Sequence, residues 1–351
     1  MIRALWRDRC VHAGEMILGL TFVQAAMLIG PIFIRPIERH IELFFLSLGV
    51  LTTLLTGRFG WSLIRSAATE PIALTGAVLV FGAVGKLTRS AFDRSIQRMR
   101  RVMPVRLLYL LLIGTLGLLS TVVTAVVAAL LLVEAITLLK IDRESEVAVV
   151  VLACFAIGLG SGLTPTGGPL GAIAISALDV DFWYLVQLLW PFVLAGILIV
   201  SLLGTVVVPV SAKSLHVSRL EERWPDILMR AIRIYAFVAG LVGLSWGLRP
   251  LVTAYVDRAP QTILFWLNSV SAIVDNAALT AAELSPALGH AQQRAALMGL
   301  LISGGMLIPG NIPNIVAANR LGISSREWAR IGLITGLPLM ALCYGALVVM
   351  H

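Results

Sequence analysis

The chain has 351 residues, of which 58% are hydrophobic and only 13% are charged, and its formal net charge is +8. A soluble core of this size does not need so much apolar surface, so the composition predicts a membrane protein and argues against a soluble enzyme. The basic residues lie in short breaks between long apolar runs, which argues against a soluble nucleic-acid-binding groove.

Long apolar runs follow one another along the chain and predict a multi-pass protein of the inner (cytoplasmic) membrane. The runs lie at about 14–34, 41–57, 70–87, 107–139, 146–178, 182–210, 228–247, 261–289, 294–320 and 328–350. Three basic breaks, at 86–106, 211–233 and 319–330, predict cytoplasmic loops because Lys and Arg accumulate on that side.

Two of these runs carry polar residues in their middle. As one helix the run 107–139 would be about 50 Å long, whereas the hydrocarbon core is about 30 Å thick. Its polar interruption at 120–124 therefore predicts a helical hairpin that enters and leaves on one side. The run 261–289 has the same form, with a polar tip at 271–276.

Two other runs contain clusters of glycine and proline. The cluster at 160–169 interrupts the run 146–178, and the cluster at 304–314 interrupts the run 294–320. Proline removes a backbone donor and glycine weakens a helix, so both stretches should unwind.

The order of helix, hairpin, broken helix and helix occurs twice. We therefore expect an all-α polytopic membrane protein with two inverted structural repeats, each with a re-entrant helical hairpin and a broken transmembrane helix. The first repeat would be 70–210 and the second 211–351, with N-terminal transmembrane helices in 1–69 as a scaffold.

Breaks at matching positions of two inverted halves are the best indication from sequence of a transport site near the bilayer midplane. The candidate ligands for an ion or a substrate are the polar residues at or near the tips and breaks, namely Ser120, Thr124, Thr164, Thr166, Ser271, Asp275, Asn276, Thr280, Asn311 and Asn314. Their oxygens suit a hard monovalent cation, although a single Ser or Thr is more often a helix-packing residue or one that bonds back to its own helix.

Asp275 is the sharpest of these candidates. A charge far from both interfaces costs at least about 3 kcal/mol, so it needs a function or a partner, and it is expected to bind a proton or a cation. Alternatively, it is a neutral hydrogen-bonded residue or a helix cap. Glu134 and Glu283 lie on the returning hairpin arms and are candidates for a proton relay; alternatively, they face water-filled vestibules or bond to neighbouring backbone.

No enzymatic activity is expected. None of the five histidines has a metal-ligand spacing, and no nucleophile lies in a pattern with a base. We expect no cofactor beyond the transported ion, for which Na⁺ is the candidate. The identity of any bound metal stays open.

The segment 271–281, S-A-I-V-D-N-A-A-L-T-A, resembles the S-A-x-x-D-N-x-P motif of D-type sodium/proton antiporters and arsenite pumps, which belong to the ion transporter superfamily. The segments 37–45, 162–171 and 306–318 are similar to a family of predicted cation transporters of unknown function. The resemblance implies inverted repeats, ion coupling and a homodimer with a scaffold and a moving transport domain.

The sequence departs from these relatives in three ways. Ala278 stands where the motif has proline, and Thr124 stands in the first half where Asp275 stands in the second. The Ser-Asn-Thr carboxylate-binding signature of dicarboxylate carriers is absent.

The leading hypothesis is a secondary active transporter for a small cation, Na⁺ in exchange for H⁺, working by alternating access. The alternative is an Na⁺- or H⁺-coupled carrier of a small anion or organic acid, for which helix N-termini would bind the anion. A channel would need a continuous polar stripe, and a scaffold would not need paired breaks.

Overall fold

The computed structural model describes residues 40–72, 75–76, 79–80, 104–139, 141–208, 224–256, 260–273, 276–284, 286 and 288–350, with scattered residues between 19 and 37. Every regular element within these residues is helical. The predicted helices at 14–34 and 70–87 lie largely outside the described residues. We call residues 104–208 the first half and residues 224–350 the second half.

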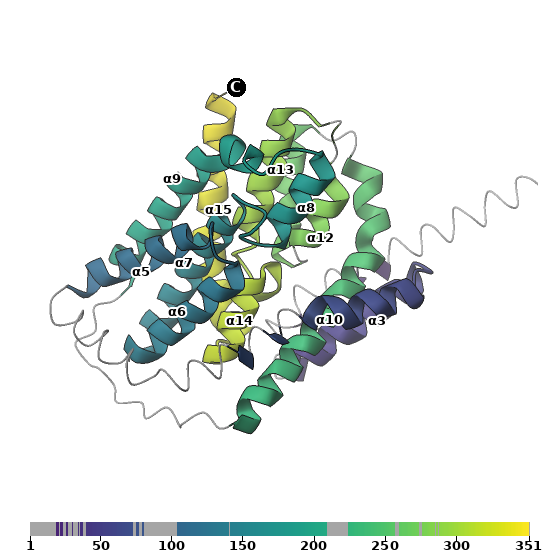
Figure 1. Cartoon of the computed structure of the whole chain (residues 1–351), viewed down its shortest axis with the longest axis horizontal. Helices are drawn as coiled ribbons and strands as arrows, with labels where there is room; N and C mark the ends of the chain where they lie inside the picture. Colours follow the sequence, from purple (N-terminus) through teal and green to yellow (C-terminus); the bar gives the residue numbers. More distant parts are fainter. Residues whose placement is uncertain are drawn as a thin grey trace, which may run out of the picture.

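The helices follow one another without intervening strands in the described part of the chain (Figure 1). They are α3 (Ile41–Leu55), α5 (Val105–Leu119), α6 (Ala125–Leu139), α7 (Arg143–Ser161), α8 (Pro169–Leu178), α9 (Tyr184–Val207), α10 (Trp224–Val256), α11 (Gln261–Leu267), the 3-10 helix η1 (Asn268–Ala272), α12 (Asn276–Glu283), α13 (His290–Ser303), the 3-10 helix η2 (Ile308–Gly310), α14 (Ile312–Leu321) and α15 (Ser325–Val349). Residues 61–72 are also helical.

The predicted interruptions are confirmed. A turn at 120–124 separates α5 from α6, and non-helical residues at 162–168 separate α7 from α8. In the second half, α13 stops before Gly304 and α14 begins at Ile312. The helix α11 gives way to η1 at Asn268, three residues before the predicted tip.

Two helices are longer than the sequence pattern predicted. The helix α7 begins at Arg143 rather than at 146, because Asp142 accepts a hydrogen bond from the amide of Ser145 and caps the helix. The helix α10 has 33 residues and continues past the predicted end at 247, through Arg249, to Val256. Charge alone does not interrupt a helix, and residues 251–256 are again mostly apolar.

Within the described residues, three helices are long and apolar enough to cross a membrane: α7, α9 and α15. These helices differ in burial: 94% of the apolar stretch of α7 is buried inside the protein, but only 33% of that of α15. Large apolar side chains on the outer helices, such as Leu198 and Ile334, are exposed. A membrane protein exposes such residues to lipid, and α7 forms the protein-filled centre.

The two halves pack into each other. The helix α6 of the first half lies against α14 of the second, and α12 of the second half lies against α8 of the first. The helix α3 runs alongside α10 (Figure 1). This pair approaches closely, since a Cβ added to Gly240 would lie 2.5 Å from the backbone nitrogen of Leu46.

Candidate functional site

The turn between α5 and α6 is hydrogen-bonded to the break between α7 and α8. Thr164 Oγ1 donates to the carbonyl oxygen of Thr121, and the amide of Ala125 donates to the carbonyl of Gly167 at 2.7 Å. The amide of Gly167 donates to Thr164 Oγ1 at 3.2 Å. The non-helical backbone of the first half therefore satisfies many of its polar groups internally, as buried backbone must.

Ser120 and Thr124 of the first half also form hydrogen bonds with nearby backbone groups. The hydroxyl of Ser120 is fully buried and lies 2.7 Å from the carbonyl of Gly117 and 3.0 Å from that of Ile157. Thr124 is exposed, and its hydroxyl accepts a 3.3 Å hydrogen bond from the amide of Val127 at the start of α6. These contacts are those of a structural turn.

The second half joins its own break to η1 through different residues. Ser303, the last residue of α13, donates from its hydroxyl to the carbonyl of Asn268 at 2.6 Å. The amide group of Asn314 donates to the carbonyls of Gly304 and Leu307, at 2.7 and 2.8 Å. A single side chain thus closes the loop between α13 and α14.

Among the described residues of the second half, three buried side-chain oxygens have no hydrogen-bond partner. They are Asn268 Oδ1, Glu283 Oε2 and Asn314 Oδ1. All three residues are at most 3% exposed, and the side chains of Asn268 and Glu283 are hydrogen-bonded to each other. An unpartnered buried acceptor costs about 1–3 kcal/mol, so each of these atoms requires an explanation.

The break of the second half lies against α7 of the first half. A Cβ added to Gly158 on α7 would lie 2.6 Å from Asn311 Nδ2, so the side-chain amide packs directly on the glycine. The thiol of Cys154, one turn earlier, lies 3.7 Å from the carbonyl of Pro313. The break between α13 and α14 is therefore covered by α7, at the centre of the molecule.

Comparison with known families gives one match. The model of a family described as "Protein of unknown function (DUF1646)" matches residues 17–350. The chain belongs to this DUF1646 family. No curated protein matches it.

In this DUF1646 member, three of the predicted site residues of the second half, Asn276, Thr280 and Asn314, lie close together. Asn276 begins α12, is 4% exposed and faces Gly304, whose added Cβ would lie 2.9 Å from its Nδ2. The hydroxyl of Thr280 is buried and donates to the carbonyl of Asn276 at 2.7 Å. Gly304 thus brings Asn276 and Asn314 to the same place.

The remaining predicted residues are less central or lie outside the described part. Thr166 is exposed and shares a 3.1 Å hydrogen bond with Thr164. Glu134 is half-buried in the middle of α6. Ser271 lies in η1, and Asp275 lies outside the described residues.

Sequence reasoning missed Asn268 and Ser303. Asn268 lies three residues before the predicted tip, and Ser303 directly precedes the glycine pair of the second break. A signal existed, because both are polar residues inside apolar runs beside a predicted interruption. Among the described residues, no three His, Cys, Asp or Glu side chains are grouped as metal ligands.

Proposed function

We propose that the chain is a secondary active transporter that exchanges a small monovalent cation, Na⁺, for H⁺ by alternating access. The observation that carries the proposal is that three buried acceptor oxygens, on Asn268, Glu283 and Asn314, have no partner in the part of the chain that the structure describes. Oxygen atoms of this kind are the ligands that a hard cation prefers, and a cation would complete their interactions.

We further propose two inverted repeats with re-entrant hairpins as the architecture, in a multi-pass protein of the inner membrane. The repeated order of elements supports this, since α5–α6, α7–α8 and α9 correspond to α11–α12, α13–α14 and α15. The reciprocal contacts of α6 with α14 and of α12 with α8 support it as well. Paired discontinuous helices are the usual transport site of such folds.

The proposed exchange of two ions is based on the chemistry of two carboxylates, those of Glu283 and Asp275. Glu283 is buried and hydrogen-bonded to Asn268, and Asp275 directly precedes Asn276 in the sequence. A carboxylate in the membrane is stable when it holds either a proton or a cation, so the two ions compete for it. The resemblance of 271–281 to D-type sodium/proton antiporters supports the same proposal, and a homodimer is part of it.

An anion carrier is the second candidate, and one observation favours it. The helices α8 and α14 begin at the two breaks, and neither Gly168 nor Asn311 caps them with a side-chain hydrogen bond. Free amides at a helix N-terminus attract anions. A carrier for a small organic acid would use these N-termini and leave the acceptor oxygens to a coupling cation.

The test uses the full chain in liposomes with an acidic interior and an internal pH dye. Adding Na⁺ or Li⁺ outside should raise the internal pH, and Asp275→Asn should abolish the response. A response to citrate, succinate or arsenite instead of the cations favours the anion carrier. The absence of any response contradicts transport, and an unaltered rate in Asp275→Asn removes Asp275 from the site.

A further inference from the structure

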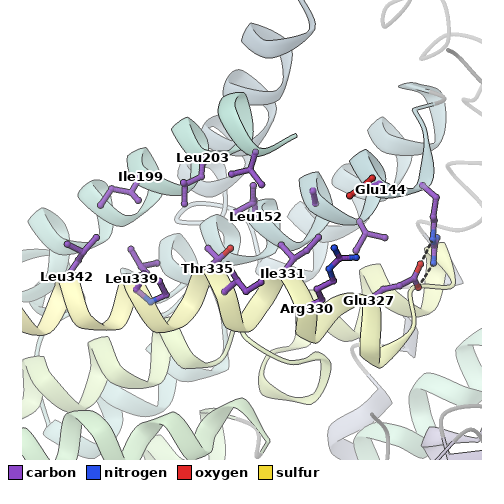
Figure 2. Close-up of a pocket in the computed structure, with 16 residues that line it drawn as sticks. Glu144, Leu152, Ile199, Leu203, Glu327, Arg330, Ile331, Thr335, Leu339 and Leu342 are labelled. Atoms are coloured by element: carbon purple, nitrogen blue, oxygen red, sulfur yellow. Dashed lines mark hydrogen bonds and ion pairs between the residues drawn. The ribbon is translucent and has the colours of Figure 1, made fainter. Parts of the chain in front are cut away.

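A groove lies between α7, α9 and α15, and none of Asn268, Glu283 and Asn314 lines it. Its cavity has a volume of about 730 Å³. Figure 2 shows its apolar walls, which come mainly from these three helices. Representative lining residues are Leu152, Ile199, Leu203, Ile331, Leu339 and Leu342.

The three helices around the groove are those that are long and apolar enough to cross a membrane in the described part of the chain. The groove therefore lies at the depth of the lipid chains, where an apolar cavity is filled by hydrocarbon rather than by water. On the outer helices the neighbouring apolar side chains Leu198 and Ile334 are exposed, so lipid can reach the groove.

One end of the groove is charged, as Figure 2 shows. Arg143 is paired there with Glu327, whose two carboxylate oxygens lie 2.8 and 2.9 Å from its Nε and Nη2, and with the buried Glu146, whose Oε1 lies 3.4 Å from its Nη1. Arg330 and Glu144 line the same end, are exposed and form no ion pair within the described residues. One positive and one negative group are thus left for a ligand.

We propose that the groove binds one zwitterionic phospholipid from the leaflet at the N-terminal end of α7. An acyl chain fills the apolar part between α9 and α15. The phosphate binds Arg330, and the ammonium group faces Glu144. A headgroup with both charges fits this end better than an anionic one, because the carboxylate of Glu144 repels a net negative lipid.

The experiment is native mass spectrometry of the full chain in mild detergent with equal amounts of phosphatidylethanolamine and phosphatidylglycerol. One phosphatidylethanolamine should remain bound per chain in preference to phosphatidylglycerol. Arg330→Gln should weaken retention about tenfold, as expected for the loss of one charge-assisted hydrogen bond. Thr335→Trp, which fills the groove but keeps both charges, should abolish retention.

The matched control is Arg326→Gln, which removes an exposed positive charge one turn earlier on α15, outside the groove, and should leave retention unchanged. Equal retention in wild type and both groove variants overturns the proposal. A preference for phosphatidylglycerol overturns the assigned headgroup. If the spectra show a dimer without bound lipid, and Thr335→Trp dissociates that dimer, the groove binds a second copy of the chain and the lipid proposal is wrong.

Discussion

The two halves of the chain share an order of helices but treat their polar groups differently. In the first half, Ser120, Thr124 and Thr164 all take part in hydrogen bonds that shape the turn and the break. In the second half, Asn268 and Asn314 also shape the backbone, yet each leaves its side-chain oxygen without a partner among the described residues.

The two breaks therefore differ in whether their buried polar side chains all have hydrogen-bond partners. Each buried acceptor without a partner costs about 1–3 kcal/mol, and the described part of the second half contains three of them, on Asn268, Glu283 and Asn314. Local backbone geometry does not require this cost, because the first half forms a comparable break without it. A ligand that supplies the missing interactions would explain the cost, which is why we propose that the second half binds the ion.

The largest expected effect is that of Glu283→Gln. The amide keeps the size of the side chain but removes the charge, so cation-driven proton flux should fall at least about a hundredfold, which corresponds to about 3 kcal/mol. The thermal unfolding temperature should change little, because no partner of Glu283 Oε2 is lost. Flux in liposomes and unfolding in detergent measure the two quantities.

The control for this variant is Asp181→Asn, which neutralises an exposed carboxylate in the loop before α9. It should keep the wild-type flux. If Glu283→Gln transports at the wild-type rate, the buried oxygens of the second half are structural, and the contrast between the halves loses its functional meaning.

A smaller and opposite effect is expected from Ser120→Ala in the first half. The loss of the buried hydroxyl, which contacts the carbonyls of Gly117 and Ile157, should lower the free energy of unfolding by about 1–2 kcal/mol. Flux per folded molecule should stay unchanged. The exposed hydroxyl of Ser47 on α3 makes a similar bond to the carbonyl of Leu43, and Ser47→Ala is the matched control.

For Ser120→Ala, unfolding by denaturant and flux normalised to folded protein are the two measurements. Reduced flux without a loss of stability would place Ser120 in the site and make the two halves equivalent.

The interruptions could be predicted from the sequence because they depend on local chemistry. Proline and glycine weaken a helix wherever they lie, and the clusters at 160–169 and 304–314 unwind in the expected places. The hairpin turn at 120–124 was predictable for a similar reason, since a polar group in an apolar run of excessive length marks a turn.

The pairing of side chains could not be predicted in the same way. The roles of Asn268 and Ser303 depend on which groups lie across from them, and that is set by the packing of η1 on α13. The sequence likewise does not reveal that Asn314 uses its amide group on two carbonyls and leaves its oxygen free. Which polar groups find a hydrogen-bond partner is decided only when the chain has folded.

The smallest expected effect concerns a contact that ties the two halves together at their charged ends. Arg143 at the start of α7 binds both carboxylate oxygens of Glu327 in α15 and also donates to the carbonyls of Leu321 and Gly322. Arg143→Lys keeps the charge but cannot reproduce this forked geometry. The arginine and glutamate side chains are 43% and 36% exposed, so solvent screening limits the expected loss of stability to about 0.5–1 kcal/mol.

A double-mutant cycle of Arg143→Lys with Glu327→Gln, measured by unfolding at low and high salt, isolates this contact. The coupling free energy should be positive at low salt and should shrink as salt is added, because the pair is exposed. A coupling of zero would mean that buried packing alone, through α6 with α14 and α12 with α8, holds the halves together. The two halves would then be joined only where both are protected from water.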